Sequence, residues 1–269
     1  MKKKNSGIIF ITLLAIIFAG ASCKSNDPVV PPAETSYSLK VKDVLGVSGT
    51  VTFIETSTNS VTIEIELTGA SAGTHPAELC MNSAVEGGTV ALVLNPVDET
   101  GKSSTLVTTM TYKELNAYDG FVQIHKSSTE QNVILANGDI GGNKITSTSK
   151  TYILSAVGTF NVSGTALFEK RVNGNTLVTI TLSGAIAGQS YPASINIGSI
   201  ASVGGGGITK TLNPVNGTTN KSYTNIKALD NNLAITYDNW MVYLGYINIY
   251  QNSDENANII CHGDIGSNI

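Results

Sequence analysis

The segment Val61-Thr-Ile-Glu-Ile-Glu-Leu67 alternates apolar and polar side chains without a break. In an extended chain the four apolar residues fall on one face, and Thr62, Glu64 and Glu66 fall on the other. A period of two predicts a strand of an antiparallel sheet with one buried face. The later segment Val178-Thr-Ile-Thr-Leu182 repeats the pattern. We therefore expect strands of this kind in both halves of the chain.

The two halves of the chain share nine short blocks of sequence in the same order. Among the matched pairs are Val47-Ser-Gly-Thr50 with Val162-Ser-Gly-Thr165, Leu94-Asn-Pro-Val97 with Leu212-Asn-Pro-Val215, and Gly138-Asp-Ile-Gly141 with Gly263-Asp-Ile-Gly266. Self-similarity of this kind predicts a duplicated domain. Each copy has about 110 residues, which is enough for a domain with its own core. We expect a first domain over residues 37–143 and a second over residues 152–269, with a linker over residues 144–151.

Turn residues separate several short predicted strands within each copy. In the first copy these strands cover residues 38–44, 49–55, 61–67, 77–82, 89–94, 104–109, 120–126 and 132–137. One short helix is expected from Tyr112, because Thr111 and Glu114 have the spacing of a capping box; Thr236 opens its counterpart, in which we expect Trp240 to pack in the core. The predicted fold class is all-β, with two tandem antiparallel β-sandwich domains of immunoglobulin-like or dismutase-like type, each with one short helix.

Residues 1–23 have the pattern of an export signal. Lys2, Lys3 and Lys4 precede an apolar run of 11 residues, which is shorter than the roughly 20 that a spanning helix needs. The small residues before Cys23 resemble the lipobox of bacterial lipoproteins, a family in which this Cys carries acyl chains. The alternative is an ordinary cleaved signal with an incidental Cys. Residues 24–36 are Pro-rich and predict a tether.

Lipid attachment predicts a location in the cell envelope. We expect the chain to be anchored by lipid at the outer membrane, facing either the periplasm or the surface. Loss of the signal leaves 13 of the 16 basic residues against 20 acidic residues. Arg171 is the one arginine. Nucleic-acid binding needs clustered Lys and Arg, so the sequence predicts no nucleic-acid partner.

Cys80 and Cys261 lie in different copies, at positions that do not correspond. An exported protein can form disulfides, so a bridge joining the two domains is one interpretation. Two buried free thiols are the other, and we expect these.

The block His75-Pro-Ala-Glu-Leu-Cys-Met-Asn82, together with Leu94-Asn-Pro-Val97 and Gly138-Asp-Ile-Gly141, resembles the chordin-domain (CHRD) family. The resemblance extends over both copies. It implies an all-β extracytoplasmic module. Bacterial members often have His-Pro-Ala-His-Ile-His at the first block, and this His-x-His strand is similar to that of copper/zinc superoxide dismutases. Here Glu78 and Cys80 occupy the two later His positions.

The first copy retains four potential metal ligands, His75, Glu78, Cys80 and His125. A thiolate, imidazoles and a carboxylate could hold Zn or Cu if they converge within bonding distance of one ion. The alternative is that Cys80 is a buried apolar filler and the histidines are surface or loop groups. The second copy has no such set, and Tyr250 replaces His125 there.

No catalytic constellation is recognisable in a chain with only three histidines. Asp139 and Asp264 lie between Gly and Ile, where we expect them to form turns by accepting backbone N–H groups. The sequence predicts a lipid-anchored, non-enzymatic binding or structural module for an unknown protein or glycan ligand, with no cofactor. The alternative functions are a degenerate dismutase-like metal-binding protein that uses the first domain, and an accessory subunit of an uptake complex.

Overall fold

The computed structural model describes residues 31–202, 205–253 and 258–269. Within these residues the chain forms sixteen strands and two short helices. The predicted signal peptide, the acylation site at Cys23 and the tether as far as residue 30 lie outside the described residues. Among the helices that are described, none is long and apolar enough to cross a membrane.

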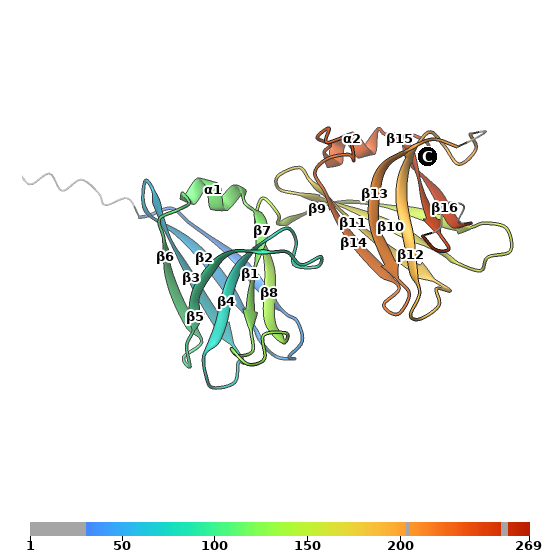
Figure 1. Ribbon diagram of the computed structural model, residues 1–269. Helices are drawn as coiled ribbons and strands as arrows, with labels where there is room; N and C mark the ends of the chain where they lie inside the picture. Colours follow the sequence, from blue (N-terminus) through green and yellow to red (C-terminus); the bar gives the residue numbers. More distant parts are fainter. Residues whose placement is uncertain (1–30, 203–204, 254–257) are drawn as a thin grey trace, which may run out of the picture. The chain divides into compact units, whose positions relative to one another are not determined.

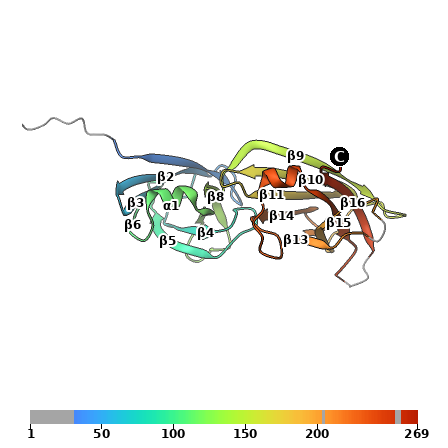
Figure 2. The same cartoon turned by 90° about the horizontal axis from the view of Figure 1, so that it is seen from above.

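The first sheet is antiparallel and spans Glu34 to Gly141 (Figure 1). Its strands are β1 (Glu34–Val41), β2 (Ser48–Ser57), β3 (Ser60–Thr68), β4 (His75–Met81), β5 (Val90–Val97), β6 (Lys102–Val107), β7 (Asp119–His125) and β8 (Ile134–Gly141). The helix α1 (Tyr112–Ala117) joins β6 to β7, and it lies over the strand ends in the view from above (Figure 2).

The second copy forms a closed antiparallel barrel. Its strands are β9 (Ile145–Ala156), β10 (Ser163–Arg171), β11 (Thr176–Ser183), β12 (Ser190–Ile197), β13 (Ile208–Asn216), β14 (Lys221–Ile226), β15 (Leu244–Tyr250) and β16 (Ile259–Gly266). The helix α2 (Tyr237–Met241) joins β14 to β15, as α1 joins β6 to β7.

Both copies have the same order of strands. The first sheet runs β5-β4-β7-β8-β1-β2-β3-β6. Read from β13, the second barrel runs β13-β12-β15-β16-β9-β10-β11-β14, and the β13–β14 contact closes it. Each strand therefore has a counterpart at the same place in the other copy, as a duplicated sequence predicts.

The repeated Leu-Asn-Pro-Val block lies where the first and the last strand of this order meet. Proline has no N–H to donate to a ladder. Instead, the side chain of Asn95 donates to the Ser104 carbonyl at 2.7 Å, and its backbone N–H donates to the Thr105 hydroxyl at 2.8 Å. Asn213 makes the same two bonds to Tyr223 and Thr224, at 2.7 and 2.9 Å. This pair of contacts, the asparagine bridge, joins β5 to β6 and β13 to β14.

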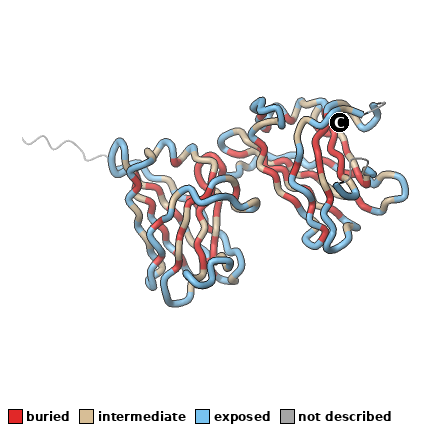
Figure 3. The backbone as a smooth tube through the Cα atoms, viewed as in Figure 1, coloured by how far each residue is buried: buried red, intermediate tan, exposed pale blue. Residues whose placement is uncertain are grey.

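The alternation of apolar and polar residues in the sequence determines which side chains form the core. All four apolar residues of the segment 61–67 are buried, whereas Glu64 and Glu66 are exposed. Buried and exposed positions alternate in this way along most strands (Figure 3). Each copy has its own cluster of buried apolar side chains, and the two clusters share no residue.

Aromatic residues fill equivalent places in the two cores. Tyr37 packs against Phe53 with ring centroids 5.3 Å apart, and Tyr152 packs against Phe168 at 5.1 Å. Trp240 on α2 is fully buried and meets Phe168 edge to face, as expected of a core residue.

Both helices begin at the residues predicted from the sequence. Thr111 caps α1 and Thr236 caps α2, and each makes both hydrogen bonds of a capping box. The all-β class with two antiparallel sheets is confirmed. The second copy is a closed barrel, so the sandwich and immunoglobulin-like details remain predictions.

The segment 144–151, predicted to be a linker, is strand from Ile145 onward. It extends β9, whose residue Ser149 pairs with Glu169 and whose residue Thr151 pairs with Leu167 of β10. Three threonines give this polar segment a high strand propensity, because β-branched side chains favour extended backbone. β1 likewise begins at Glu34, inside the predicted tether.

Candidate functional site

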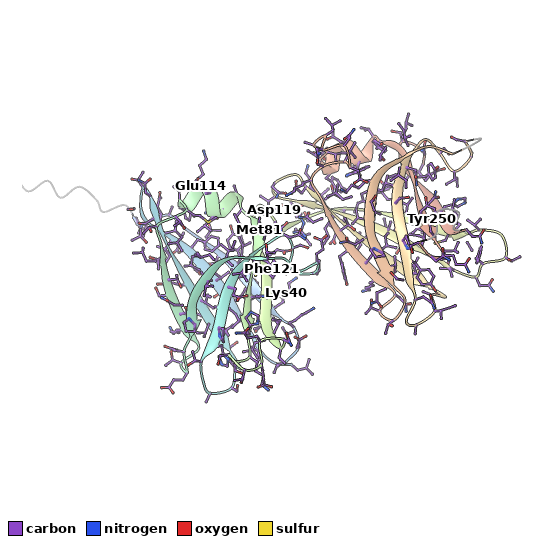
Figure 4. All side chains as sticks on the ribbon, viewed as in Figure 1. Lys40, Met81, Glu114, Asp119, Phe121 and Tyr250 are labelled. Atoms are coloured by element: carbon purple, nitrogen blue, oxygen red, sulfur yellow. The ribbon has the colours of Figure 1, made fainter. Side chains whose placement is uncertain are left out.

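Four polar residues lie side by side across the outer face of the first sheet. Glu78 on β4 pairs with Gln123 on β7, which pairs with Asn137 on β8, which pairs with Lys40 on β1. Their neighbours along each strand, such as Ala77 and Leu39, point into the core, so these four side chains point outward. We call them the first polar row; Lys40 at its end is labelled in Figure 4.

The second copy has a row in the same register. Ser194 on β12 pairs with Asn248 on β15, which pairs with His262 on β16, which pairs with Ser155 on β9. Each residue corresponds to a member of the first row, in the same order. Ser194 and Asn248 are buried. The second polar row therefore has the position of the first row but neither its carboxylate nor its lysine.

His125 lies within hydrogen-bond distance of the first polar row. Its Nε2 lies 3.0 Å from Oε2 of Glu78, and Gln123 donates to the same oxygen at 3.1 Å. Its Nδ1 lies 2.5 Å from the carbonyl oxygen of Gln131, which can only accept, so Nδ1 carries a proton.

His75 lies apart from this pair in its contacts. It begins β4, it is 2% exposed, and its Nδ1 and Nε2 lie 2.6 and 3.0 Å from the carbonyl oxygens of Lys126 and Ser71. Both ring nitrogens are occupied by backbone acceptors, so neither is available to a metal. His75 therefore holds two loops together at the end of the sheet.

Cys80 and Cys261 are both free and fully buried. Burial is the main reason that the pKa of the Cys80 thiol rises to about 11, and the nearby Glu78 carboxylate adds to the rise. Burial also raises the pKa of Cys261 to about 12. A metal ligand or nucleophile must be a thiolate, and these environments favour the neutral thiol.

The four potential metal ligands of the sequence do not come together as a set. Glu78 and His125 are in contact, but both ring nitrogens of His75 lie against backbone carbonyls, and burial raises the pKa of the Cys80 thiol. In the part of the chain that the structure describes, no three His, Cys, Asp or Glu side chains are placed to share a metal ion. Of the four predicted ligands, Glu78 and His125 are therefore the pair that the structure brings within hydrogen-bond distance.

A pocket of about 350 Å³ opens at the Lys40 end of the first polar row. It lies between β1, β8 and the start of β9, with the loop after β4 forming one wall. The polar residues that line it include Ser36, Ser38, Lys40, Asn137 and Lys144. Ala84, Val85 and Ile145 supply apolar surface. We call it the lysine pocket.

The charges at the lysine pocket favour an anion. Asp139 lines the pocket, but its Oδ2 accepts from Nη1 of the fully buried Arg171 at 3.0 Å, and its Oδ1 accepts from the Ala84 N–H at 2.8 Å. Within the described residues, neither lysine side chain forms an ion pair or a hydrogen bond. The two ammonium groups are therefore available to a ligand.

Glu169 is an acidic neighbour of this pocket. Burial raises the pKa of Glu169, and Arg171 and Lys40 act in the opposite direction. The raised pKa means that burial disfavours the charged form of this carboxyl group. Glu169 does not line the pocket itself.

The two aspartates of the Gly-Asp-Ile-Gly blocks accept backbone N–H groups, as predicted. Asp139 accepts from Ala84, and Asp264 accepts from Ile200 at 2.9 Å. They lie within β8 and β16 rather than in turns, and each holds a loop distant in sequence against its strand. Only Asp139 also binds a charged partner, Arg171.

The lysine pocket and the polar rows were not predicted from the sequence. Alternation in Ser36-Tyr-Ser-Leu-Lys40 indicates which residues of β1 point outward. It does not indicate that β8 is the neighbouring strand, because that pairing joins strands far apart in the chain. Comparisons with protein-family models, with curated proteins and with solved structures found no match.

Proposed function

We propose that this chain is a non-enzymatic binding module of the cell envelope, held at the outer membrane by acyl chains on Cys23, whose ligand occupies the lysine pocket. The observation that carries the proposal is the pocket itself. It is lined by serine and asparagine residues together with Lys40 and Lys144, which form no ion pair or hydrogen bond within the described residues. A volume of about 350 Å³ is within the range of small-ligand sites. The ligand is a glycan, or part of one, rather than a protein surface.

The lining favours a sugar that carries a carboxylate. Serine hydroxyls and an asparagine amide can both donate to and accept from sugar hydroxyls. The apolar residues Val85 and Ile145 suit the C–H face of a sugar ring. An ammonium group bound to a carboxylate makes a charge-assisted hydrogen bond, which is stronger than a neutral one. We therefore expect acidic sugars to bind more tightly than neutral ones.

Calorimetric titration with a short oligogalacturonate and with its neutral methyl ester tests the proposal. Lys40→Gln and Lys144→Gln are each expected to weaken binding of the acidic sugar about fivefold, because an exposed ion pair is worth up to about 1 kcal/mol. Lys42→Gln is the control: it removes the same charge from an exposed residue outside the pocket. Equal binding of the acid and the ester, or an equal loss in the control, would contradict the proposal.

Attachment by lipid is a separate part of the proposal and has its own test. Cys23→Ser removes the acyl site and is expected to release the chain from the membrane fraction. Several acyl chains anchor stably, because each buried CH₂ contributes about 0.8 kcal/mol. A Cys23→Ser chain that still fractionates wholly with membranes would contradict the lipid anchor and leave the lysine pocket unaffected.

We also propose that the two copies are chordin-domain modules, related to dismutase-like sandwiches. Support comes from the placement of the repeated blocks. The block that begins at His75 forms β4, and its counterpart forms β12. The Gly-Asp-Ile-Gly blocks close β8 and β16. Strands β4 and β12 are also the strands on which the two polar rows begin.

A further inference from the structure

One end of the first sheet is hydrogen-bonded to β14 of the second barrel. The Asn225 side chain donates to Asp119 at 3.1 Å and to Oδ1 of Asn143 at 3.2 Å. The Asn225 backbone N–H donates to Glu86 at 2.8 Å. This internal junction brings the start of β7 and the loop after β4 against β14, and its contacts are polar.

The same end of the second barrel is built in the same way. At the internal junction, the Asn143 side chain donates to the carbonyls of Asn82 at 2.6 Å and Gly120 at 3.4 Å. In the second copy, the Asn268 side chain donates to the carbonyls of Gly198 at 2.6 Å and Gly245 at 2.9 Å. The backbone framework that supports the junction is therefore present twice.

Exposed aliphatic side chains lie at this end of the second barrel. Leu244 corresponds to Asp119 and is 58% exposed. Ile197, whose backbone pairs with Gly245 beside it, is 51% exposed, and Ile208 on the adjoining β13 is 56% exposed. Leu244 lies on the outer side of β15 and Ile197 on the core-facing side of β12, so these exposed aliphatic residues form an apolar patch around the rim of this end of the barrel.

The first sheet carries the surface that would match this patch. Leu106 on β6 corresponds to Asn225 on β14 and is 60% exposed. Val93 on β5, two residues before Asn95 of the asparagine bridge, is 71% exposed. Where the internal junction pairs Asp119 with Asn225, the corresponding positions on the two outer surfaces hold Leu244 and Leu106. Within one chain the junction therefore brings two polar side chains together. In a contact between two chains, the equivalent positions would bring two leucines together.

We propose that the chain binds a second copy of itself head to tail, with the Leu244 end of one second barrel seated on the Leu106 face of the next chain's first sheet. The contact repeats the internal junction and removes apolar surface from water. It joins two different surfaces, so a dimer keeps one surface of each kind free, and further copies can add to form rings or open chains. This self-association is independent of any ligand in the lysine pocket.

Site-specific crosslinking tests the proposal with the full chain in detergent. Every variant carries Cys23→Ser, so that the remaining native thiols, Cys80 and Cys261, are fully buried. Leu106→Cys with Leu244→Cys, treated with a short bismaleimide, is expected to give a ladder of dimers and larger species. Leu106→Cys with Ile186→Cys is the control, because Ile186 is 66% exposed and lies in the loop before β12, at the other end from Ile197.

Asp119→Cys with Asn225→Cys shows that the reagent works, since these residues are in contact within one chain. Adding Ile197→Asp to the reactive pair is expected to lower the yield of the ladder about tenfold, as for a central residue of an interface. The proposal is overturned if the control pair gives the same ladder or if the reactive pair stays monomeric while the internal pair reacts. It is also overturned if Leu244→Cys alone yields dimers as readily, which would indicate a symmetric contact.

Discussion

Asp139 and Asp264 show how one repeated residue acquires two roles. Both accept a backbone N–H from the loop after the fourth strand of their copy. The other oxygen of Asp264 accepts from the Ser199 hydroxyl at 3.2 Å, whereas that of Asp139 accepts from the buried Arg171 guanidinium. Removing Asp139 leaves the charge of the buried Arg171 uncompensated, which is more destabilising than weakening the hydrogen bonds that Asp264 accepts from neutral donors.

We therefore expect Asp139→Asn to lower the free energy of unfolding by about 3 kcal/mol. Asp264→Asn, the matched control, should lower it by about 1 kcal/mol. Urea titration followed by circular dichroism measures both values. Equal effects at the two positions would show that the Arg171 contact contributes nothing beyond the shared loop contact.

The two buried thiols give a prediction from their raised pKa values. The pKa is about 11 for Cys80 and about 12 for Cys261. At pH 8 both thiols are therefore expected to stay protonated and unreactive. In a Cys23→Ser chain, iodoacetamide is expected to modify neither thiol in the native state and both in urea. Mass spectrometry at successive times checks this, and rapid labelling of the native chain would contradict the burial of the thiols.

At the scale of strands and helices, the sequence indicated each strand of the first copy to within a few residues. Local signals sufficed for this: alternation in Val61-Thr-Ile-Glu-Ile-Glu-Leu67, turn residues between strands, and the capping box at Thr111. The N-terminal part of β9 was missed because its residues are polar on both faces and show no alternation. Its pairing with β10, rather than its own composition, makes it a strand.

The asparagine bridge is a contact between strands that a single substitution can test. Asn95→Ala removes the side-chain bond to Ser104 and is expected to lower the free energy of unfolding by about 1 kcal/mol. Amides of β5 and β6 should then exchange with solvent faster than those of β2 and β3, because the bridge joins only the former pair. Asn59→Ala, in the exposed turn after β2, is the control and is expected to be neutral.

At the scale of the whole molecule, the sequence predicted the duplication but did not predict the lysine pocket. The pocket depends on β8 pairing with β1, which follows from how the sheet curves back on itself rather than from any local pattern. The same holds for Glu78 and His125, which meet because β4 pairs with β7. Residue types suggested a metal set of four, and the topology brought two of them together.

The two copies differ at the lysine pocket, which predicts the number of ligands per chain. Lys40 corresponds to Ser155, and Lys144 corresponds to Ile269. The second copy therefore lacks both ammonium groups. We expect calorimetry with the oligogalacturonate to give one site per chain; two equal sites would mean that the lysines do not define the ligand.

Backbone NMR of the isotopically labelled chain during titration with the oligogalacturonate tests the site most directly. We predict that amide shifts concentrate at residues 36–40, 84–85, 137–139 and 144–145, the segments that line the lysine pocket. Amides of β10 to β14 should stay unchanged. Shifts confined to the second barrel, or no shift at saturating sugar, would contradict the assignment of the ligand site to the first copy.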